Sequence, residues 1–164
     1  LPAAYAALAR GGEWFPPTLV SRAQDALPET TRIVSDRTAF WITDILADAD
    51  ARSYIFGHGG SLEFPFAVAA KTGTSQSYFD NWVVGYTRDV TVGVWVGNFD
   101  RTPLRGSSGI TGAGPIFHAV MLAAEQRRGL RNVRDASRRR LSDPRERVAD
   151  NSRRASVHVA SRYR

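Results

Sequence analysis

The chain has 164 residues, no cysteine and a formal net charge of +6 at pH 7. The absence of cysteine excludes a disulfide scaffold, a thiolate-bound zinc site and a thiol nucleophile. Hydrophobic residues make up 43% of the chain, which is enough for a packed core, and no apolar run approaches the roughly 20 residues that span a bilayer. The positive charge belongs to one end, because residues 125–164 hold 13 arginines and five acids, whereas residues 1–124 carry −2.

The first predicted elements are a helix and two short extended segments. Residues 2–10 are rich in alanine, which favours a helix, and Gly11-Gly12 are expected to end it. Short extended segments are expected at residues 14–15 and 31–34. Prolines between these two segments break helical continuity.

A second helix is predicted to begin after Ser35, a residue that suits an N-cap. Apolar residues recur at helical spacing from Phe40 to Ala49, so the helix is expected over residues 36–49. The segment that follows, residues 52–63, contains several glycines and is expected to be a loop.

Three strands are predicted next, within residues 64–75, at residues 82–86 and at residues 90–96. Arg88-Asp89 form only a short connection between the last two strands, which are therefore expected to pair as an antiparallel hairpin. The predicted fold class is α+β, with a three-stranded antiparallel meander and flanking helices.

A glycine-rich loop is predicted over residues 106–114, followed by a helix that begins near Pro115. The apolar stripe of this helix gives it a face to bury, and Gly129 is expected to end it. Beyond that point the periodicity is lost, so residues 126–164 are interpreted as an Arg-rich, disordered tail.

The pattern that indicates chemistry is Lys71-Thr72-Gly73-Thr74, and Lys71 is the only lysine in the chain. Because side chains alternate along a strand, Thr72 and Thr74 are expected on one face and Lys71 and Gly73 on the other. Two hydroxyls on one face suit a carboxylate ligand, an ammonium group adds positive charge, and an unpaired strand edge can bind an extended peptide. A strand that carries Lys-Thr-Gly is one of three elements of serine acyl transferases such as penicillin-binding proteins and class A β-lactamases.

The flanks of this motif resemble the C-terminal part of the transpeptidase domain of class A bifunctional penicillin-binding proteins, most closely the 1C type. Four segments carry the resemblance: Phe66-Ala67-Val68-Ala69-Ala70-Lys71-Thr72-Gly73-Thr74-Ser75, Asp80-Asn81-Trp82-Val83-Val84-Gly85-Tyr86, Val94-Trp95-Val96-Gly97-Asn98-Phe99-Asp100 and Thr111-Gly112-Ala113-Gly114-Pro115-Ile116-Phe117. The resemblance implies a partial penicillin-binding, β-lactamase-like fold over residues 1–125. Two of the five sheet strands of that family would then lie upstream of this chain, and one edge of the meander would be unpaired.

The resemblance also implies roles for the residues of the motif. Lys71 and Thr74 would be catalytic residues, and Lys71, Thr72, Gly73 and Thr74 would bind a D-Ala-D-Ala stem peptide of peptidoglycan or a β-lactam. The hydroxyls of Thr72 and Thr74 would hold the carboxylate of that ligand, and the backbone N–H of Thr74 would be one oxyanion donor. The implied location is the periplasmic side of the cell inner membrane, and no cofactor is implied.

Two further motifs of this family are absent from the 164 residues. The Ser-x-x-Lys motif, which carries the nucleophile, would need a serine where Val68 stands, and none of the 13 serines begins a Ser-x-Asn motif. The chain begins with Leu1 and is expected to be a fragment whose partner is the missing N-terminal half of the transpeptidase domain. Alone it is expected to be inactive, because no acyl-enzyme forms without the nucleophile.

Other candidate sites are weaker than this motif. The glycine-rich loop resembles a phosphate cradle but lacks the Gly-Lys-Ser/Thr ending. The histidines, His58, His118 and His158, are scattered, so no metal site is expected. The arginines of residues 126–164 leave an alternative function open, a non-enzymatic basic module that binds nucleic acid or an anionic membrane surface. A solvated end, or sequence read out of its original frame, is the preferred interpretation, because Tyr163 alone gives no stacking platform for nucleic acid.

Overall fold

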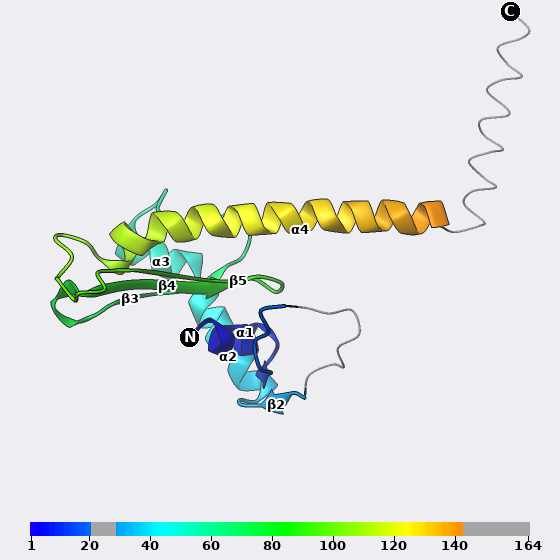
Figure 1. Ribbon diagram of the computed structural model, residues 1–164, viewed down its shortest axis with the longest axis horizontal. Coiled ribbons are helices and arrows are strands. Elements are labelled where there is room, and N and C mark those ends of the chain that lie inside the picture. The colour runs from blue at the N-terminus through cyan, green and yellow to red at the C-terminus, as the bar shows by residue number, and fades with distance from the viewer. Residues whose placement is uncertain (21–28, 143–164) are drawn as a thin grey trace, which may run out of the picture. The chain divides into compact units, whose positions relative to one another are not determined.

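The computed structural model describes the backbone of residues 1–20 and 29–142, and the side chains of residues 1–20 and 29–130. The chain divides into two compact units, residues 1–123 and 124–164. The described elements follow this order (Figure 1): α1 Pro2–Ala9, β1 Glu13–Trp14, β2 Thr31–Arg32, α2 Asp36–Ala47, α3 Ala49–Phe56, β3 Ala69–Thr74, the 3-10 helix η1 Gln76–Tyr78, β4 Asp80–Tyr86, β5 Thr91–Gly97, the π-helix η2 Gly109–Ala113 and α4 Gly114–Ser142.

The described strands form two antiparallel sheets, which confirms the α+β class and the predicted meander. One sheet has the strand order β3-β4-β5, and β1 pairs with β2 in a two-residue ladder. Helices α1 and α2 contact the larger sheet, and η2 contacts all three of its strands. The two short extended segments expected near residues 14 and 31 are therefore a small sheet of their own, next to α1.

The register of the larger sheet decides which residues share a face. Thr72 is paired with Val83, and Thr74 with Asn81, whereas Lys71 is opposite Val84. Because cross-strand partners point to the same side of a sheet, Thr72 and Thr74 share the face of Val83, and Lys71 lies on the other face. This register confirms the alternation that the sequence predicts.

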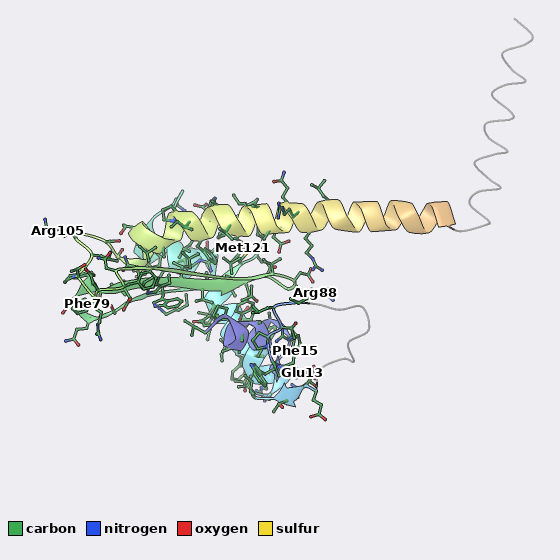
Figure 2. The ribbon with its side chains drawn as sticks, in the orientation of Figure 1. Glu13, Phe15, Phe79, Arg88, Arg105 and Met121 are labelled. Carbon is green, nitrogen blue, oxygen red and sulfur yellow. The ribbon has the colours of Figure 1, made fainter. Side chains whose placement is uncertain are left out.

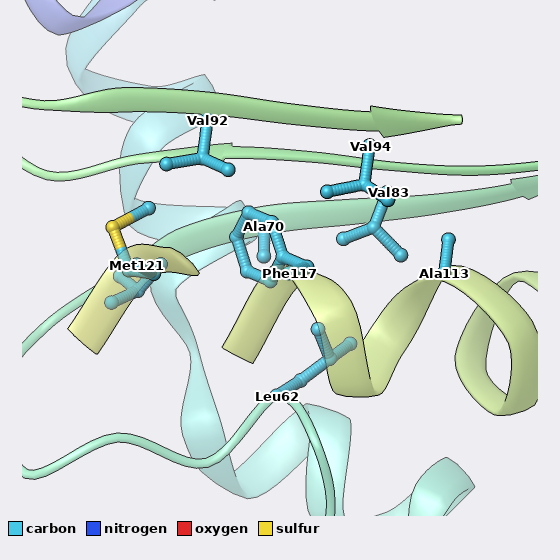
Figure 3. Close-up of a cluster of buried hydrophobic side chains, with 9 residues drawn as sticks. Leu62, Ala70, Val83, Val92, Val94, Ala113, Phe117 and Met121 are labelled. Atoms are coloured by element: carbon cyan, nitrogen blue, oxygen red, sulfur yellow. The ribbon is translucent and has the colours of Figure 1, made fainter. Parts of the chain in front are cut away.

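The core lies between the Val83 face of the sheet and the first turns of α4 (Figure 3). Phe117 and Met121 of α4 are fully buried there, and Phe64 packs edge-on against Phe117 with ring centroids 5.9 Å apart. The buried members of the cluster are Leu62, Val68, Ala70, Val83, Val92, Val94, Ala113, Phe117 and Met121. The apolar stripe predicted for this helix is thus only partly used, because Ile116 and Val120 are exposed.

The helix expected over residues 36–49 is in fact two helices, and the loop expected over 52–63 is wrong in its first part. α2 ends at Ala47, and α3 occupies Ala49–Phe56. Asp48 separates them in an extended conformation, and its carboxylate accepts a hydrogen bond of 2.9 Å from the Ala51 N–H. An N-cap of this kind begins a new helix without any apolar periodicity, so a prediction from periodicity does not detect it.

Two further boundaries differ from the predictions. α4 does not end at Gly129 but continues to Ser142, because an isolated glycine lowers helix stability without ending a helix. The disorder expected for the rest of the Arg-rich tail falls on residues 143–164, outside the described residues. β3 occupies only Ala69–Thr74 of the segment 64–75 in which a strand is expected; Pro65, near the start of that segment, has no N–H to donate to a strand ladder.

Gly85 of β4 provides a test of how closely α4 packs on the sheet. An added Cβ at Gly85 would lie 2.7 Å from both the Ala69 carbonyl oxygen and Phe117 Cζ. We expect Gly85→Ala to lower the free energy of unfolding by about 1–3 kcal/mol, because overpacking forces the backbone or Phe117 to move. Urea unfolding followed by tryptophan fluorescence measures this. Gly60→Ala is the matched control, since its Cβ would meet only Phe56 O at 3.8 Å; equal effects of the two substitutions would contradict the packing.

Candidate functional site

The Lys-Thr-Gly-Thr pattern occupies β3, an edge strand of the three-stranded sheet. Lys71 and Thr74 are exposed, and Thr72 and Gly73 are half-buried. The Lys71 ammonium donates a hydrogen bond of 2.6 Å to the Thr72 carbonyl oxygen. Within the described part of the chain Lys71 forms no ion pair, so none of the described carboxylates neutralises its positive charge.

The backbone of β3 presents polar groups at its free edge. The Ser75 N–H bonds to Asp80 O at 2.9 Å, in the same register as the rest of the β3-β4 ladder. Hydrogen-bonded and non-hydrogen-bonded pairs alternate in an antiparallel ladder, so the pairs of Thr74 with Asn81 and of Thr72 with Val83 are non-hydrogen-bonded. The N–H and C=O groups of Thr72 and Thr74 therefore point away from β4, toward the open edge.

Residues 75–79 connect β3 to β4 and are held by hydrogen bonds to the end of the ladder. Ser75 Oγ accepts a hydrogen bond of 2.7 Å from the Asp80 N–H, and Ser77 and Tyr78 have positive φ angles of 59°. Trp95 of β5 donates from Nε1 to Asp80 Oδ1 at 2.8 Å. Figure 2 shows this end of the sheet beside Phe79 and Arg105, with Arg88 at the opposite end.

Residues 107–111 lie on the same end of the sheet. The Gly109 N–H donates to Thr74 Oγ1 at 3.0 Å, and Asn81 Nδ2 donates to Ser107 Oγ at 2.6 Å. Ser108 and Thr111 form a capping box that begins η2. The predicted glycine-rich loop is thus in part the helical turn η2, and of its glycines Gly109 lies against the backbone of β3 and β4 beside the exposed Thr74.

Asn81 is a functional candidate that the sequence analysis missed. Its side chain is fully buried, and its Oδ1 atom has no hydrogen-bond partner. An unpaired buried acceptor destabilises a protein by about 1–3 kcal/mol. The available signal was alternation along β4, since residues 81, 83 and 85 share the core face, where Val83 is apolar and an asparagine is unexpected.

Two groups with shifted pKa values support the opposite end of β3. Burial raises the pKa of the Tyr86 phenol, and the hydrogen bond of 2.8 Å that it shares with the Thr43 hydroxyl opposes this shift. Burial lowers the pKa of the Arg52 guanidinium, which donates to Val68 O at 3.0 Å. These contacts fix α2 and α3 to the start of β3, away from Thr74.

The histidines do not form a site in the described residues. His118 stacks on Phe64 with ring centroids 4.7 Å apart, and its Nδ1 atom lies 3.3 Å from Ser61 O. Among the described residues there is no group of three or more side chains suited to a metal ion. His158 lies outside those residues.

Comparison with known proteins decides the family. Residues 1–122 match the penicillin binding protein transpeptidase domain. The chain belongs to this family. It is similar to penicillin-binding protein 1C of Escherichia coli (strain K12), with 33% identity over 120 residues that cover 73% of this chain and 15% of the relative. Penicillin-binding protein 1A of Streptococcus pneumoniae is 31% identical over 144 residues, which cover 74% of this chain and 20% of the relative.

A solved structure supports the fold. The imipenem acyl-enzyme complex of penicillin-binding protein A from M. tuberculosis superposes with a TM-score of 0.58 at 23% identity, covering 75% of this chain and 30% of that chain. The chain therefore has part of the penicillin-binding transpeptidase fold, and it spans a fifth or less of the length of the two curated relatives named above. Among the described helices, none is both long and apolar enough to cross a membrane.

The close approach of Gly109 to β3 can be tested directly. An added Cβ at Gly109 would meet Gly73 O at 2.9 Å and Trp82 O at 3.0 Å, and both atoms belong to the backbone. We expect Gly109→Ala to lift residues 107–111 from β3, so that the amide at position 109 exchanges with solvent at least about tenfold faster by NMR. The β4-β5 amides and the control Gly129→Ala, which has open space around it, should be unchanged. Unchanged exchange at position 109 would contradict this contact.

Proposed function

We propose that residues 1–125 are the C-terminal portion of the transpeptidase domain of a class A, 1C-type penicillin-binding protein, in which β3 binds the donor substrate. The substrate is the D-Ala-D-Ala stem peptide of peptidoglycan, and a β-lactam binds in its place. The observation that supports the proposal is the edge strand β3 in a chain of this family: its Lys71 and Thr74 are exposed, and Lys71 forms no ion pair among the described residues. Residues 126–164 are proposed to be a separate tail, and the working location is the periplasmic side of the inner membrane.

Each group of β3 has a proposed role that fits its position. The ammonium of Lys71 attracts the anionic ligand, and the hydroxyls of Thr72 and Thr74 donate to its carboxylate. The outward N–H of Thr74 is placed at the open edge, where it can stabilise the oxyanion that develops on the attacked carbonyl. Gly73 has no side chain that would obstruct a ligand on β3. An added Cβ at this position would have one neighbour within 4 Å, Trp82 Cβ at 3.6 Å.

The nucleophile is proposed to come from another segment. Neither Ser-x-x-Lys nor Ser-x-Asn occurs in the 164 residues. A Ser-x-x-Lys motif that ends at Lys71 would need a serine at position 68, where Val68 stands, and the Val68 side chain is buried in the core at 1% exposure. The serine oxygen would attack the carbonyl carbon of the penultimate D-Ala, the C–N bond would break, and the terminal D-Ala would leave with a proton. The chain then supplies substrate binding, and its partner supplies the serine.

The surface of α2 fits such a partner. Its Phe40, Trp41 and Ile45 side chains are 65%, 55% and 72% exposed, although α2 lies against β3. Large apolar side chains gathered on one exposed face are typical of a surface that another chain or segment covers. The missing N-terminal half of the transpeptidase domain is the occupant that we propose.

The first test is covalent labelling with benzylpenicillin, followed by intact-mass spectrometry. The 164-residue chain alone should form no adduct, because it has no nucleophile motif. A hybrid in which residues 1–122 replace the matched segment of E. coli penicillin-binding protein 1C should form one adduct, on a serine of the E. coli part. An adduct on the isolated chain would contradict the missing nucleophile, and an unlabelled, folded hybrid would contradict the proposed function.

The second test addresses Lys71 in that hybrid. Lys71→Ala should lower the second-order acylation rate by about 10², because the positive charge that attracts the anionic ligand is lost. Lys71→Arg should lose less but not be silent, since a planar guanidinium does not replace a compact ammonium. Arg88→Ala, at the opposite end of the sheet in Figure 2, is the matched control for loss of a positive charge. Equal rates for Lys71→Ala and the parent would remove β3 from the site.

A further inference from the structure

We propose that Asn81 is a positioning residue, which holds residues 107–109 over β3 so that the hydroxyl of Thr74 is fixed as a hydrogen-bond donor to the ligand carboxylate. This inference rests on the proposed function, and it concerns a residue outside the Lys-Thr-Gly-Thr strand. Asn81 would thereby determine the orientation of the Thr74 hydroxyl at the exposed end of β3.

Asn81 is a buried polar residue in β4. It lies on the core face of β4, its side chain is fully buried, and its Oδ1 atom is unpaired. An apolar side chain would fill this place without an orphaned acceptor. Among the described residues the Asn81 side-chain amide makes one hydrogen bond, from Nδ2 to Ser107 Oγ at 2.6 Å, and this bond is therefore the property that distinguishes asparagine here.

Room for that hydrogen bond depends on Gly112. An added Cβ at Gly112 would lie 2.5 Å from Ser107 Oγ and 2.7 Å from Asn81 Nδ2, the two atoms that the hydrogen bond joins. Any side chain at position 112 would push them apart. The turn of η2 and the buried amide thus form one unit on the end of the sheet.

The segment that contains Ser107 also contacts Thr74. Two residues after Ser107, the Gly109 N–H donates to Thr74 Oγ1 at 3.0 Å. Gly109 lies so close to β3 that an added Cβ would be 2.9 Å from Gly73 O. The hydrogen bond from Asn81 to Ser107 and the one from Gly109 to Thr74 therefore belong to the same short segment, residues 107–109.

The proton of the Thr74 hydroxyl is available to a ligand. A threonine hydroxyl has one O–H donor and two acceptor lone pairs. The Gly109 N–H occupies one lone pair, and within the described residues no acceptor receives the O–H of Thr74. The exposed hydroxyl therefore presents its proton to an incoming anion, and O–H donation to a carboxylate is a strong, charge-assisted hydrogen bond.

The experiment uses the full 164-residue chain and needs no nucleophile. Binding of N-acetyl-D-Ala-D-Ala and of the same peptide with a C-terminal carboxamide is measured by NMR titration. The parent should prefer the carboxylate peptide, and Thr74→Val should remove this preference. Asn81→Ala and Ser107→Ala should each weaken binding of the carboxylate peptide about tenfold, the size of one charge-assisted hydrogen bond, and change binding of the carboxamide less than twofold.

A double-mutant cycle separates positioning from general stability. Asn81→Ala added to Thr74→Val should cause no further loss, because both act on one hydrogen bond. Asn98→Ala is the matched control, since Asn98 is exposed and bonds Thr102 O at 2.9 Å. If Asn81→Ala does not fold, the same binding measurements are made with Ser107→Ala.

The outcomes distinguish the two proposals. A parent chain that binds both peptides equally would overturn the proposed function together with this inference. If the parent and Thr74→Val behave as expected, additive losses, or equal weakening of both peptides by Asn81→Ala and Ser107→Ala, would overturn the role of Asn81 alone.

Discussion

The contact of Phe117 with the bare backbone at Gly85 is the constraint on which the rest of the first unit depends. It sets the distance between α4 and the β3-β4-β5 sheet, because a single methyl group at Gly85 would lie 2.7 Å from the ring of Phe117. Ala113, one helical turn earlier, is also fully buried. The start of α4 and the η2 turn before it are therefore held firmly against the sheet.

Two more glycines allow close contacts near the end of β3. Gly109 rests on the β3-β4 backbone, and Gly112 leaves space for the buried Asn81 amide. A side chain at Gly85, Gly109 or Gly112 would therefore push apart groups that are now in close contact between the sheet and the η2-α4 segment. Among the described strands none pairs with the outer edge of β3, and this edge is where the ligand is proposed to bind.

Much of this arrangement follows from local sequence signals. Alternation along β3 predicted the faces of Thr72 and Lys71, and the short Arg88-Asp89 connection predicted the β4-β5 hairpin; the register confirms both. The split between α2 and α3 escaped prediction because it depends on the Asp48 cap, which interrupts a helix without changing its composition. The continuation of α4 past Gly129 escaped for a related reason, since glycine weakens a helix but does not forbid it.

The sequence by itself determined the family and the strand that carries its Lys-Thr-Gly pattern, because residue identity and spacing along one strand are local properties. Only the tertiary structure revealed that Gly109 donates to Thr74 and that Asn81 is buried behind Ser107. These contacts join residues 35 and 26 positions apart, so no periodicity within an element can indicate them. They depend on the packing distance between a helix and a sheet, which the buried side chains determine together.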